Sequence, residues 1–348
     1  MSDIESINLV NSPVLICGMH RSGTSLVAQL LNTCGLHLGN EVQLMQTNPE
    51  DNPTGYWEYT DAVQFADSLL SQTGSSWKNP KNLFSDSWLI DLNYEKEKQN
   101  AIEIFKPLMD SRRIWGWKDP RATILLPFWQ KLFPRMKLVI CLRNPLEVAF
   151  SLSKRYVSHV DFFDSLKLWK NYYELFTKVK HEVNALVTHY ESLFYNPQEE
   201  ITRLCNFTGL NPSTTLISTS ITAIEPELYR IMVPNDFIDA FGDLPEGLQE
   251  TYSSLCSLAG KQYQSLRKDE EYLNQRGKEW PKKIYKTSVH SFDNFYKVVT
   301  EKNDLIEELS KRIYEIEGLI SYYSDSRSWR ITEPLRKIMD LFRKKNYD

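Results

Sequence analysis

The sequence predicts an α/β fold, in which a central parallel sheet lies between two layers of helices. Four short apolar runs indicate buried strands, because the strands of a parallel sheet are covered on both faces. Helix-like spacing of apolar residues follows the first and third runs, which is the alternation that a parallel sheet requires. A turn with two glycines joins the first run to the first helical pattern.

The runs that indicate strands are residues 13–19, 114–117, 138–142 and 185–188. The helical patterns occur at 26–31, from 148 onward, at 198–210 and at 248–266. Residues 43–93 are rich in Asn, Pro, Ser, Gly and aromatic side chains. This stretch therefore predicts loops that overhang one edge of the sheet.

The end of the chain follows another pattern, which predicts a main domain over 1–280 and a helical extension over 281–348. Apolar residues in the extension repeat every seven positions, and they are Val299, Ile306, Leu309, Ile313, Ile316 and Ile320. This spacing predicts either a short coiled coil, through which two chains would associate, or a helix packed on the domain. The basic amphipathic tail from Arg327 onward suits either an anionic membrane surface or a helix that packs by its apolar side.

Composition narrows the class of protein. The chain has 348 residues, with 41 Lys and Arg against 45 Asp and Glu, and this balance predicts no nucleic-acid partner. The five cysteines are scattered without a Cys-x-x-Cys pair, which indicates a reducing compartment and no zinc site. The sequence shows neither a signal peptide nor an apolar run of the roughly 20 residues that a membrane span needs. We therefore expect a cytoplasmic protein.

The turn after the first apolar run, CGMHRSGTS, has the glycine spacing of a phosphate-binding loop but lacks its lysine. Gly18 and Gly23 match the pattern G-x-x-x-x-G-K-[ST], and Thr24 occupies the lysine position. Backbone N–H groups and the positive end of the following helix attract an anion, and Arg21 adds a permanent charge. The hydroxyl groups that add donors are Ser22, Thr24 and Ser25. The loop predicts a P-loop-type site for a 5′-phosphate with a second anionic group and no metal.

A second cluster follows the third apolar run. Arg143 comes directly after residues 138–142, at the strand end where open α/β sheets bind ligands. Ser151 and Arg155 are four residues apart, so they share one face of the following helix. Two arginines and a hydroxyl suit a dianionic phosphate monoester.

These two segments together resemble a known family. "GMHRSGTSLVAQLL" followed by "LVICLRNPLEVAFSLSKR" is similar to sulfotransferases that use 3′-phosphoadenosine 5′-phosphosulfate (PAPS), in the branch of protein-tyrosine and bacterial carbohydrate sulfotransferases. The resemblance covers residues 14–210. It implies PAPS as the co-substrate, 3′,5′-adenosine bisphosphate as the product, and no metal. In this family the first motif binds the 5′-phosphosulfate, and the second, here Arg143, Ser151 and Arg155, binds the 3′-phosphate.

The resemblance also implies roles for single residues. Lys118, in "GWKDPRATILLPFW", resembles the lysine of the family's Lys-Asp-Pro segment and would stabilise the leaving group. Arg21 would stabilise the region of the bridging oxygen. Tyr190, in "VTHYESL", matches a segment that contacts the nucleotide, and His20 in the loop is a further candidate for contact with the donor.

The catalytic base has two candidates, since relatives place a Glu or His after the first helix. Glu41, in "GNEV", is nearer to the spacing of the protein-tyrosine branch, whereas Glu58, in "NPTGYWEY", has the context of bacterial members. We prefer Glu58, because its aromatic neighbours are expected to raise its pKa toward a value useful for a base.

Aromatic residues are expected to line the acceptor site, where their faces suit sugar rings; they are Tyr56, Trp57, Tyr59, Trp77, Trp115 and Trp117. The segment "SRSWRITEPLR" resembles the ends of bacterial glycosyltransferases that build surface polysaccharides, which favours a glycan or glycolipid acceptor at the inner face of the membrane. Two alternatives stay open. One is a divergent P-loop kinase or NTPase with Asp119 as its metal ligand, and the other is a non-catalytic scaffold in polysaccharide biosynthesis.

Overall fold

The computed structural model describes residues 12–48, 52, 54–80, 83, 87–109, 113–153, 160–226, 229, 233, 238, 244–266, 308, 311–312 and 314–316. The chain divides into two units, Met1–Val289 and His290–Asp348, and each unit is described by itself.

The first unit is built on a four-stranded parallel sheet with the strand order β2-β1-β3-β4. The strands are β1 (Val14–Cys17), β2 (Gly116–Lys118), β3 (Lys137–Leu142) and β4 (Asn184–His189). Val14 of the fully buried β1 pairs with Gly116 on one side and with Lys137 on the other. The predicted α/β fold with a central parallel sheet is confirmed, as is each of its four predicted strands.

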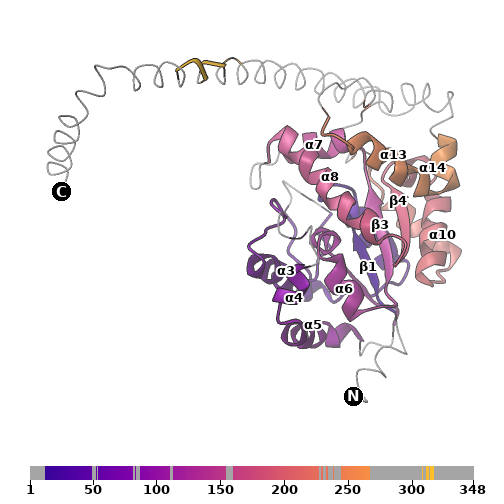
Figure 1. Ribbon diagram of the computed structural model, residues 1–348. Helices are drawn as coiled ribbons and strands as arrows, with labels where there is room; N and C mark the ends of the chain where they lie inside the picture. Colours follow the sequence, from indigo (N-terminus) through magenta and orange to yellow (C-terminus); the bar gives the residue numbers. More distant parts are fainter. Residues whose placement is uncertain are drawn as a thin grey trace, which may run out of the picture. The chain divides into compact units, whose positions relative to one another are not determined.

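Helices cover both faces of this sheet (Figure 1). On one face, α2 (Thr24–Thr33) packs against β1 and β2, and α10 (Pro197–Thr208) packs against β3 and β4. On the other face, α8 (Phe162–Val179) contacts α6 (Leu126–Leu132) and reaches β3 through the Tyr173 hydroxyl. Because alternate strand residues point to opposite faces, one apolar core forms between each helix layer and the sheet.

The other helices of the unit are α3 (Thr60–Gln72), α4 (Ser87–Asp91), α5 (Tyr94–Met109), α7 (Pro145–Ser153), α9 (Ser192–Tyr195), α11 (Thr214–Thr222), α13 (Leu248–Leu258) and α14 (Gly260–Leu266), with 3-10 turns η1 (Glu41–Gln43) and η3 (Pro120–Thr123).

The loops predicted for residues 43–93 do not fill this stretch, because α3 and α4 lie within it. In α3, Ala62, Phe65, Ala66 and Leu69 recur at helical spacing and are buried, and the helix packs against α5. Polar residues and glycines flank α3 on both sides, so the average composition of the stretch indicates loops although α3 has an apolar stripe.

The described part of the second unit is short. It comprises helical residues between 308 and 316, with an ion pair of 3.0 Å between Arg312 Nη2 and Glu308 Oε1. Ile316, one of the predicted heptad positions, is helical and 55% exposed. The other heptad positions and the basic tail lie outside the described residues, so the coiled coil and the boundary at residue 280 stay predictions.

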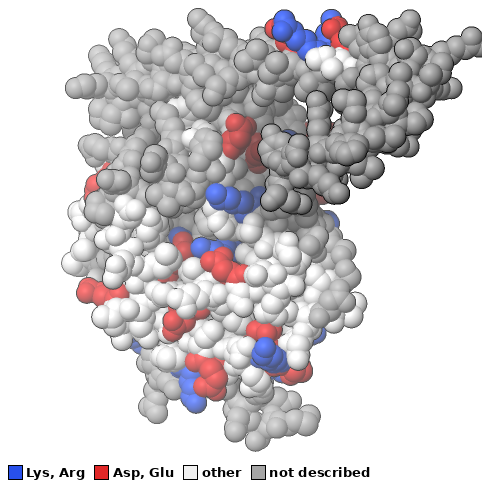
Figure 2. Space-filling model, turned by 90° about the vertical axis from the view of Figure 1, so that its left-hand side faces the viewer, with Lys and Arg blue, Asp and Glu red and all other residues white. Residues whose placement is uncertain are grey.

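The surface of the described residues carries mixed charge. On the face shown in Figure 2, acidic and basic side chains are interspersed and form no broad patch of one sign in the part that is described. Among the helices that the structure describes, none has both the length and the apolar character of a membrane span.

Candidate active site

Each of the four strands ends next to a predicted site residue. The glycine loop follows β1, Lys118 ends β2, Arg143 follows β3, and Tyr190 follows β4. The parallel strands bring these four positions to one edge of the sheet. Since β1 lies between β2 and β3, the glycine loop is flanked by Lys118 on one side and by Arg143 on the other. From β1 the chain adds β2 on one side, and it then adds β3 on the other side of β1. Ligands bind at such switch points, where the strand order reverses, in open α/β sheets.

The glycine loop is held in one shape by contacts with three other segments. Gly18 has φ +134° and donates its N–H to Thr123 Oγ1 at 2.7 Å. The Tyr173 hydroxyl accepts the N–H of Met19 at 3.3 Å and donates to the carbonyl of Cys141 at 2.6 Å. Arg21 has φ +70°, a backbone conformation that costs a non-glycine residue roughly 1–3 kcal/mol and is found most often at functional sites.

Replacing Gly18 by alanine is expected to destabilise the protein by several kcal/mol. An added Cβ would lie 2.3 Å from the carbonyl oxygen of Cys141, which belongs to the central strand β3 and cannot move aside. Gly35→Ala is the matched control, because Gly35 also has a positive φ of +108° but its added Cβ would meet only Leu210, at 3.9 Å. Urea unfolding should show a loss of about 1–2 kcal/mol for the control and a clearly larger loss for Gly18→Ala; equal losses would contradict this description of the loop.

The first turn of α2 is arranged to accept an anion. Gly23, at its N-cap, has φ +87°, no side chain caps the helix, and its first turn has no acidic residue. The unpaired N–H groups and the positive end of the helix dipole are therefore not neutralised by any of the described residues. The ring of Tyr190 lies directly against Gly23, where an added Cβ would be 2.2 Å from it.

The three predicted hydroxyl donors differ in their surroundings. Ser22 is fully buried and its Oγ is 3.2 Å from the Tyr173 hydroxyl. Ser25 donates to the carbonyl of Tyr56 at 3.3 Å and accepts from Asn52 Nδ2 at 3.1 Å. The hydroxyls of Ser22 and Ser25 thus bind other parts of the protein in this structure, whereas none of the described hydrogen bonds involves the Thr24 hydroxyl.

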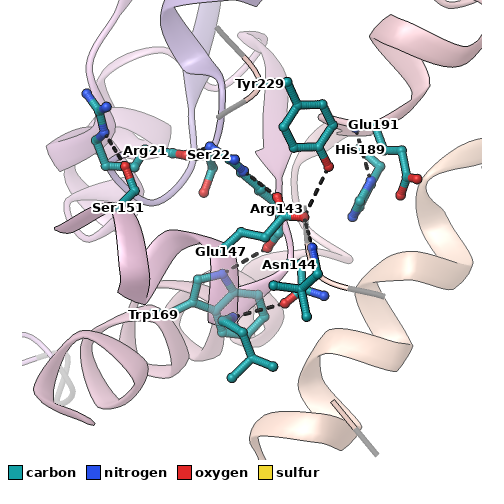
Figure 3. A network of polar contacts seen from close by, with 12 residues as sticks. Arg21, Ser22, Arg143, Asn144, Glu147, Ser151, Trp169, His189, Glu191 and Tyr229 are labelled. Carbon is teal, nitrogen blue, oxygen red and sulfur yellow. Dashed lines mark hydrogen bonds and ion pairs between the residues drawn. The ribbon is translucent and has the colours of Figure 1, made fainter. Parts of the chain in front are cut away.

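The two predicted anion-binding motifs contact each other directly (Figure 3). Arg21 donates from Nε to Ser151 Oγ at 2.9 Å, and Arg143 donates from Nη1 to the carbonyl of Arg21 at 3.2 Å. The predicted partner Arg155 lies outside the described residues. Arg21, Ser151 and Arg143 are therefore brought together at the β1–β3 switch point.

Arg143 is buried among one carboxylate and two tyrosine rings, a set of contacts that the sequence did not predict. It donates from Nε to Glu147 Oε2 at 2.7 Å, and its guanidinium carbon lies 4.5 Å from the ring centre of Tyr190 and 5.2 Å from that of Tyr229. Tyr229 also donates to Glu147 Oε1 at 3.1 Å (Figure 3). Burial alone would lower the pKa of Arg143, but the Glu147 carboxylate and the two tyrosines raise it. The i, i+4 spacing of Arg143 and Glu147 was a signal for this pair.

On the β2 side of the loop, Glu58 and Lys118 form a buried ion pair. Lys118 Nζ lies 2.5 Å from Glu58 Oε1, and both residues are at most 5% exposed. Arg121 Nη1 lies 3.3 Å from the other carboxylate oxygen, Glu58 Oε2. The structure thus joins the preferred base to the lysine predicted to act on the leaving group, and it adds Arg121, which sequence reasoning missed although it follows directly after Lys-Asp-Pro.

The prediction that the pKa of Glu58 is raised is wrong. Burial alone would raise this pKa, but the positive charges of Lys118 and Arg121 outweigh burial and lower it. Asp119 differs from Glu58, because burial raises its pKa to about 6, and the attraction of Arg121 offsets burial only in part. Glu58 is therefore ionised at neutral pH, and its state depends on the two cations.

The remaining site candidates lie in different surroundings. Glu41 is exposed in η1, and none of the described interactions joins it to Lys118. His20 is buried, with its ring centre 4.4 Å from Trp77 and 6.1 Å from Tyr172. Glu41 is therefore an exposed side chain that is not part of the described ion pair, and the His20 ring packs against Trp77.

Three of the aromatic residues predicted to line an acceptor site are instead core residues. Tyr59, Trp115 and Trp117 are buried and pack around Phe105. The prediction is wrong for these three, because Trp117 of β2, Trp115 just before it and Tyr59 all pack on the buried ring of Phe105. The other three residues of the predicted set, Tyr56, Trp57 and Trp77, are partly exposed.

Asp119, which a kinase-like reaction would need as a metal ligand, is engaged within the protein. Its Oδ1 accepts the backbone N–H of Arg121 at 2.9 Å, which caps η3, and also the Arg121 guanidinium at 2.9 Å. Among the described residues, no group of three or more His, Cys, Asp or Glu side chains could hold a metal ion.

Comparisons with known proteins give the following matches. Residues 13–214 match the model of the sulfotransferase family. A "Putative protein-tyrosine sulfotransferase" of Caenorhabditis briggsae is 27% identical over 107 residues, which are 29% of this chain and 38% of that protein. The protein of the same name in Caenorhabditis elegans is 27% identical over 100 residues, 27% of this chain and 39% of that protein. The matches thus span about two fifths of these relatives. Among solved structures, sulfotransferase STF9 of Mycobacterium avium has a TM-score of 0.46 and 12% identity, over 71% of this chain and 76% of that one.

Proposed function

The chain belongs to the sulfotransferase family, and from this premise we propose that it transfers the sulfuryl group of PAPS to a hydroxyl of a glycan or glycolipid. The observation that carries the proposal is the contact between the two anion-binding motifs. The side chain of Arg21, in the loop after β1, reaches Ser151, and Arg143 binds the backbone of the same loop residue. One compact ligand with two separate anionic groups fits this arrangement.

The residues present suit PAPS in their charge and hydrogen-bonding groups. The first turn of α2 has no capping side chain and no acidic residue, so its N–H groups are suited to the 5′-phosphosulfate. Arg143 and Ser151 would hold the 3′-phosphate, and Arg21, which contacts both residues, would stabilise the region of the bridging oxygen. In this structure Glu147 forms an ion pair with Arg143. Tyr190, which lies against Gly23 and Arg143, would contact the nucleotide, and His20 lies in the same loop.

The buried pair on the β2 side would perform the chemistry. Glu58 would accept the proton of the acceptor hydroxyl while the hydroxyl oxygen forms a bond to sulfur. The bond between sulfur and the bridging oxygen breaks at the same time, and Lys118 would stabilise the negative charge that develops on the departing phosphate. These roles need Glu58 ionised, which the lowered pKa provides.

The acceptor and the location are less directly supported. Tyr56 and Trp57 are partly exposed immediately before Glu58, and Trp77 covers His20. Aromatic faces of this kind suit the apolar faces of sugar rings. The C-terminal likeness to bacterial glycosyltransferase ends also supports a glycan or glycolipid, modified in the cytoplasm or at the inner face of the membrane. The C-terminal tail would provide the membrane contact or the self-association.

A transfer assay tests this function. The protein is incubated without added metal and with EDTA, together with PAPS labelled in its sulfuryl group and a panel of bacterial glycans and glycolipids. We expect label in one acceptor class, detected by mass spectrometry as a sulfate ester. Transfer of phosphate from ATP in the presence of Mg²⁺, without any transfer from PAPS, would instead support the kinase alternative, and nucleotide binding without turnover of any donor would support the scaffold.

A further inference from the structure

Arg121 is the centre of a buried cluster of charges beside the proposed base. Its guanidinium contacts three carboxylates, with distances of 3.3 Å to Glu58 Oε2, 2.9 Å to Asp119 Oδ1 and 2.7 Å to Asp67 Oδ1. Only 9% of Arg121 is exposed. These contacts join η3, which holds Arg121, to the segment before α3, which holds Glu58, and to α3 itself, which holds Asp67.

The structure gives Glu58 two cations, although one would suffice to neutralise it. Lys118 binds Oε1 and Arg121 binds Oε2, so each oxygen of the carboxylate has its own partner. In the proposed reaction Lys118 acts on the leaving phosphate, so its charge is then shared between the phosphate and Glu58. A buried carboxylate that loses its only cation takes up a proton, and a protonated Glu58 could no longer act as a base.

We propose that Arg121 is a positioning residue that keeps Glu58 ionised and oriented while Lys118 is engaged with the donor. This inference rests on the proposed sulfuryl transfer. Asp119 and Asp67 hold Arg121 in place from two sides, and Asp119 is itself tied to β1 by its N–H bond to the carbonyl of Ile16 at 3.1 Å. Arg121 is thereby fixed in the scaffold, whereas Lys118 is linked through its ammonium group to Glu58 alone among the described residues.

The charged and titratable groups that the structure describes around Glu58 are consistent with this division of roles. Lys118 on β2 and Arg121 on η3 are the two cations, and Asp119 and Asp67 are the neighbouring carboxylates. Tyr172 on α8 also faces the cluster, and burial raises its pKa well above its ordinary value, so it stays neutral. The described cluster thus has two cations against three carboxylates, so loss of both cations would leave Glu58 beside two other carboxylates without a compensating charge.

The first test measures the pH dependence of transfer in Arg121→Gln and Arg121→Lys. Loss of a cation next to Glu58 should raise the pH below which kcat/KM falls by about 1–3 units. At lower pH, kcat/KM should be roughly tenfold smaller for each unit of this shift. Arg121→Lys should recover part of this shift, and affinity for 3′,5′-adenosine bisphosphate should stay unchanged. Arg135→Gln, at an exposed position, is the control and should change nothing. A lower kcat without a shift of the limb would overturn the proposal.

The second test does not need turnover, so it separates this inference from the proposed function. Lys118→Gln imitates the state in which the lysine has left Glu58. Infrared difference spectroscopy with isotope-labelled glutamate should show Glu58 ionised at neutral pH in Lys118→Gln and protonated in Lys118→Gln/Arg121→Gln, with Glu58→Gln identifying its band. Protonation already in the single variant, or an ionised Glu58 in the double variant, would overturn the role of Arg121 even if sulfuryl transfer is confirmed. Failure of the transfer assay alone would overturn only the reaction.

Discussion

Replacing Glu58 by glutamine is expected to lower kcat by about 10²- to 10⁴-fold, the range that a general base contributes. Glutamine has nearly the same shape, and its one amide oxygen can accept from only one of the two cations, Lys118 and Arg121, which hold the carboxylate at 2.5 and 3.3 Å. It cannot take a proton from the acceptor. Affinity for 3′,5′-adenosine bisphosphate, measured by calorimetry, should remain within a few-fold of that of the unmodified protein.

Glu41→Gln is the matched control for this experiment, because Glu41 is the alternative base and its side chain is exposed. We expect its kcat to be unchanged. The opposite result, with a large loss for Glu41→Gln and none for Glu58→Gln, would assign the base to η1 and would make the buried pair purely structural.

The ionisation of Glu58 also determines how stability depends on pH. The pKa of Glu58 is lower in the folded than in the unfolded protein, because the cations outweigh burial. Its ion pairs therefore stabilise the fold at pH values above the unfolded pKa, and this contribution is lost as the pH falls through the folded pKa. Glu58→Gln should accordingly reduce the dependence of the unfolding free energy on pH in the acid range.

Replacing Arg143 by alanine is expected to cost about 3–5 kcal/mol of stability, the usual result of leaving one member of a buried ion pair without its partner. Glu147 would then lie buried with only the Tyr229 hydroxyl and the N–H of Val233 as described partners. The substitution would also remove the donor to the Arg21 carbonyl, so the glycine loop should loosen and nucleotide affinity should fall. Urea unfolding and calorimetry measure the two effects separately.

Two further variants show whether the cost comes from the buried charge. Arg143→Met/Glu147→Gln removes both charges and should recover a large part of the lost stability. Lys167→Ala breaks the exposed pair with Asp164, in which both side chains are about two thirds exposed, and should cost at most about 1 kcal/mol. Equal costs for Arg143→Ala and Lys167→Ala would show that the Arg143–Glu147 pair is not buried as described.

The fold could be predicted from local sequence because its signals are local. The buried strand Val14–Cys17 is a continuous apolar run, and the glycines that follow it are needed for the backbone conformation of the loop. The helix α3 was missed because its apolar stripe is interrupted by polar residues and flanked by turn-forming ones. Because the main site candidates lie at the carboxyl ends of the predicted strands, their place at one edge of the sheet could be predicted together with the fold.

The pairing within the site could not be predicted in the same way. Glu58 and Lys118 are 60 residues apart, and no local pattern shows that they meet. Without this contact, the aromatic neighbours of Glu58 suggested a raised pKa, whereas the nearby cations lower it. Arg121 was overlooked because an arginine after a turn is ordinarily a surface residue, and its burial depends on three carboxylates from separate segments.

Calorimetric titration with 3′,5′-adenosine bisphosphate, 5′-AMP and ATP, in EDTA, tests most directly whether one nucleotide spans the loop after β1 and the Arg143–Ser151 motif. Hydrogen bonds to a charged phosphate contribute about 1.5–3 kcal/mol. We therefore expect the bisphosphate to bind about 10- to 100-fold more tightly than 5′-AMP without metal, and Ser151→Ala to reduce this preference. Equal affinity for the bisphosphate and 5′-AMP, or tight binding that requires ATP and Mg²⁺, would contradict this expectation.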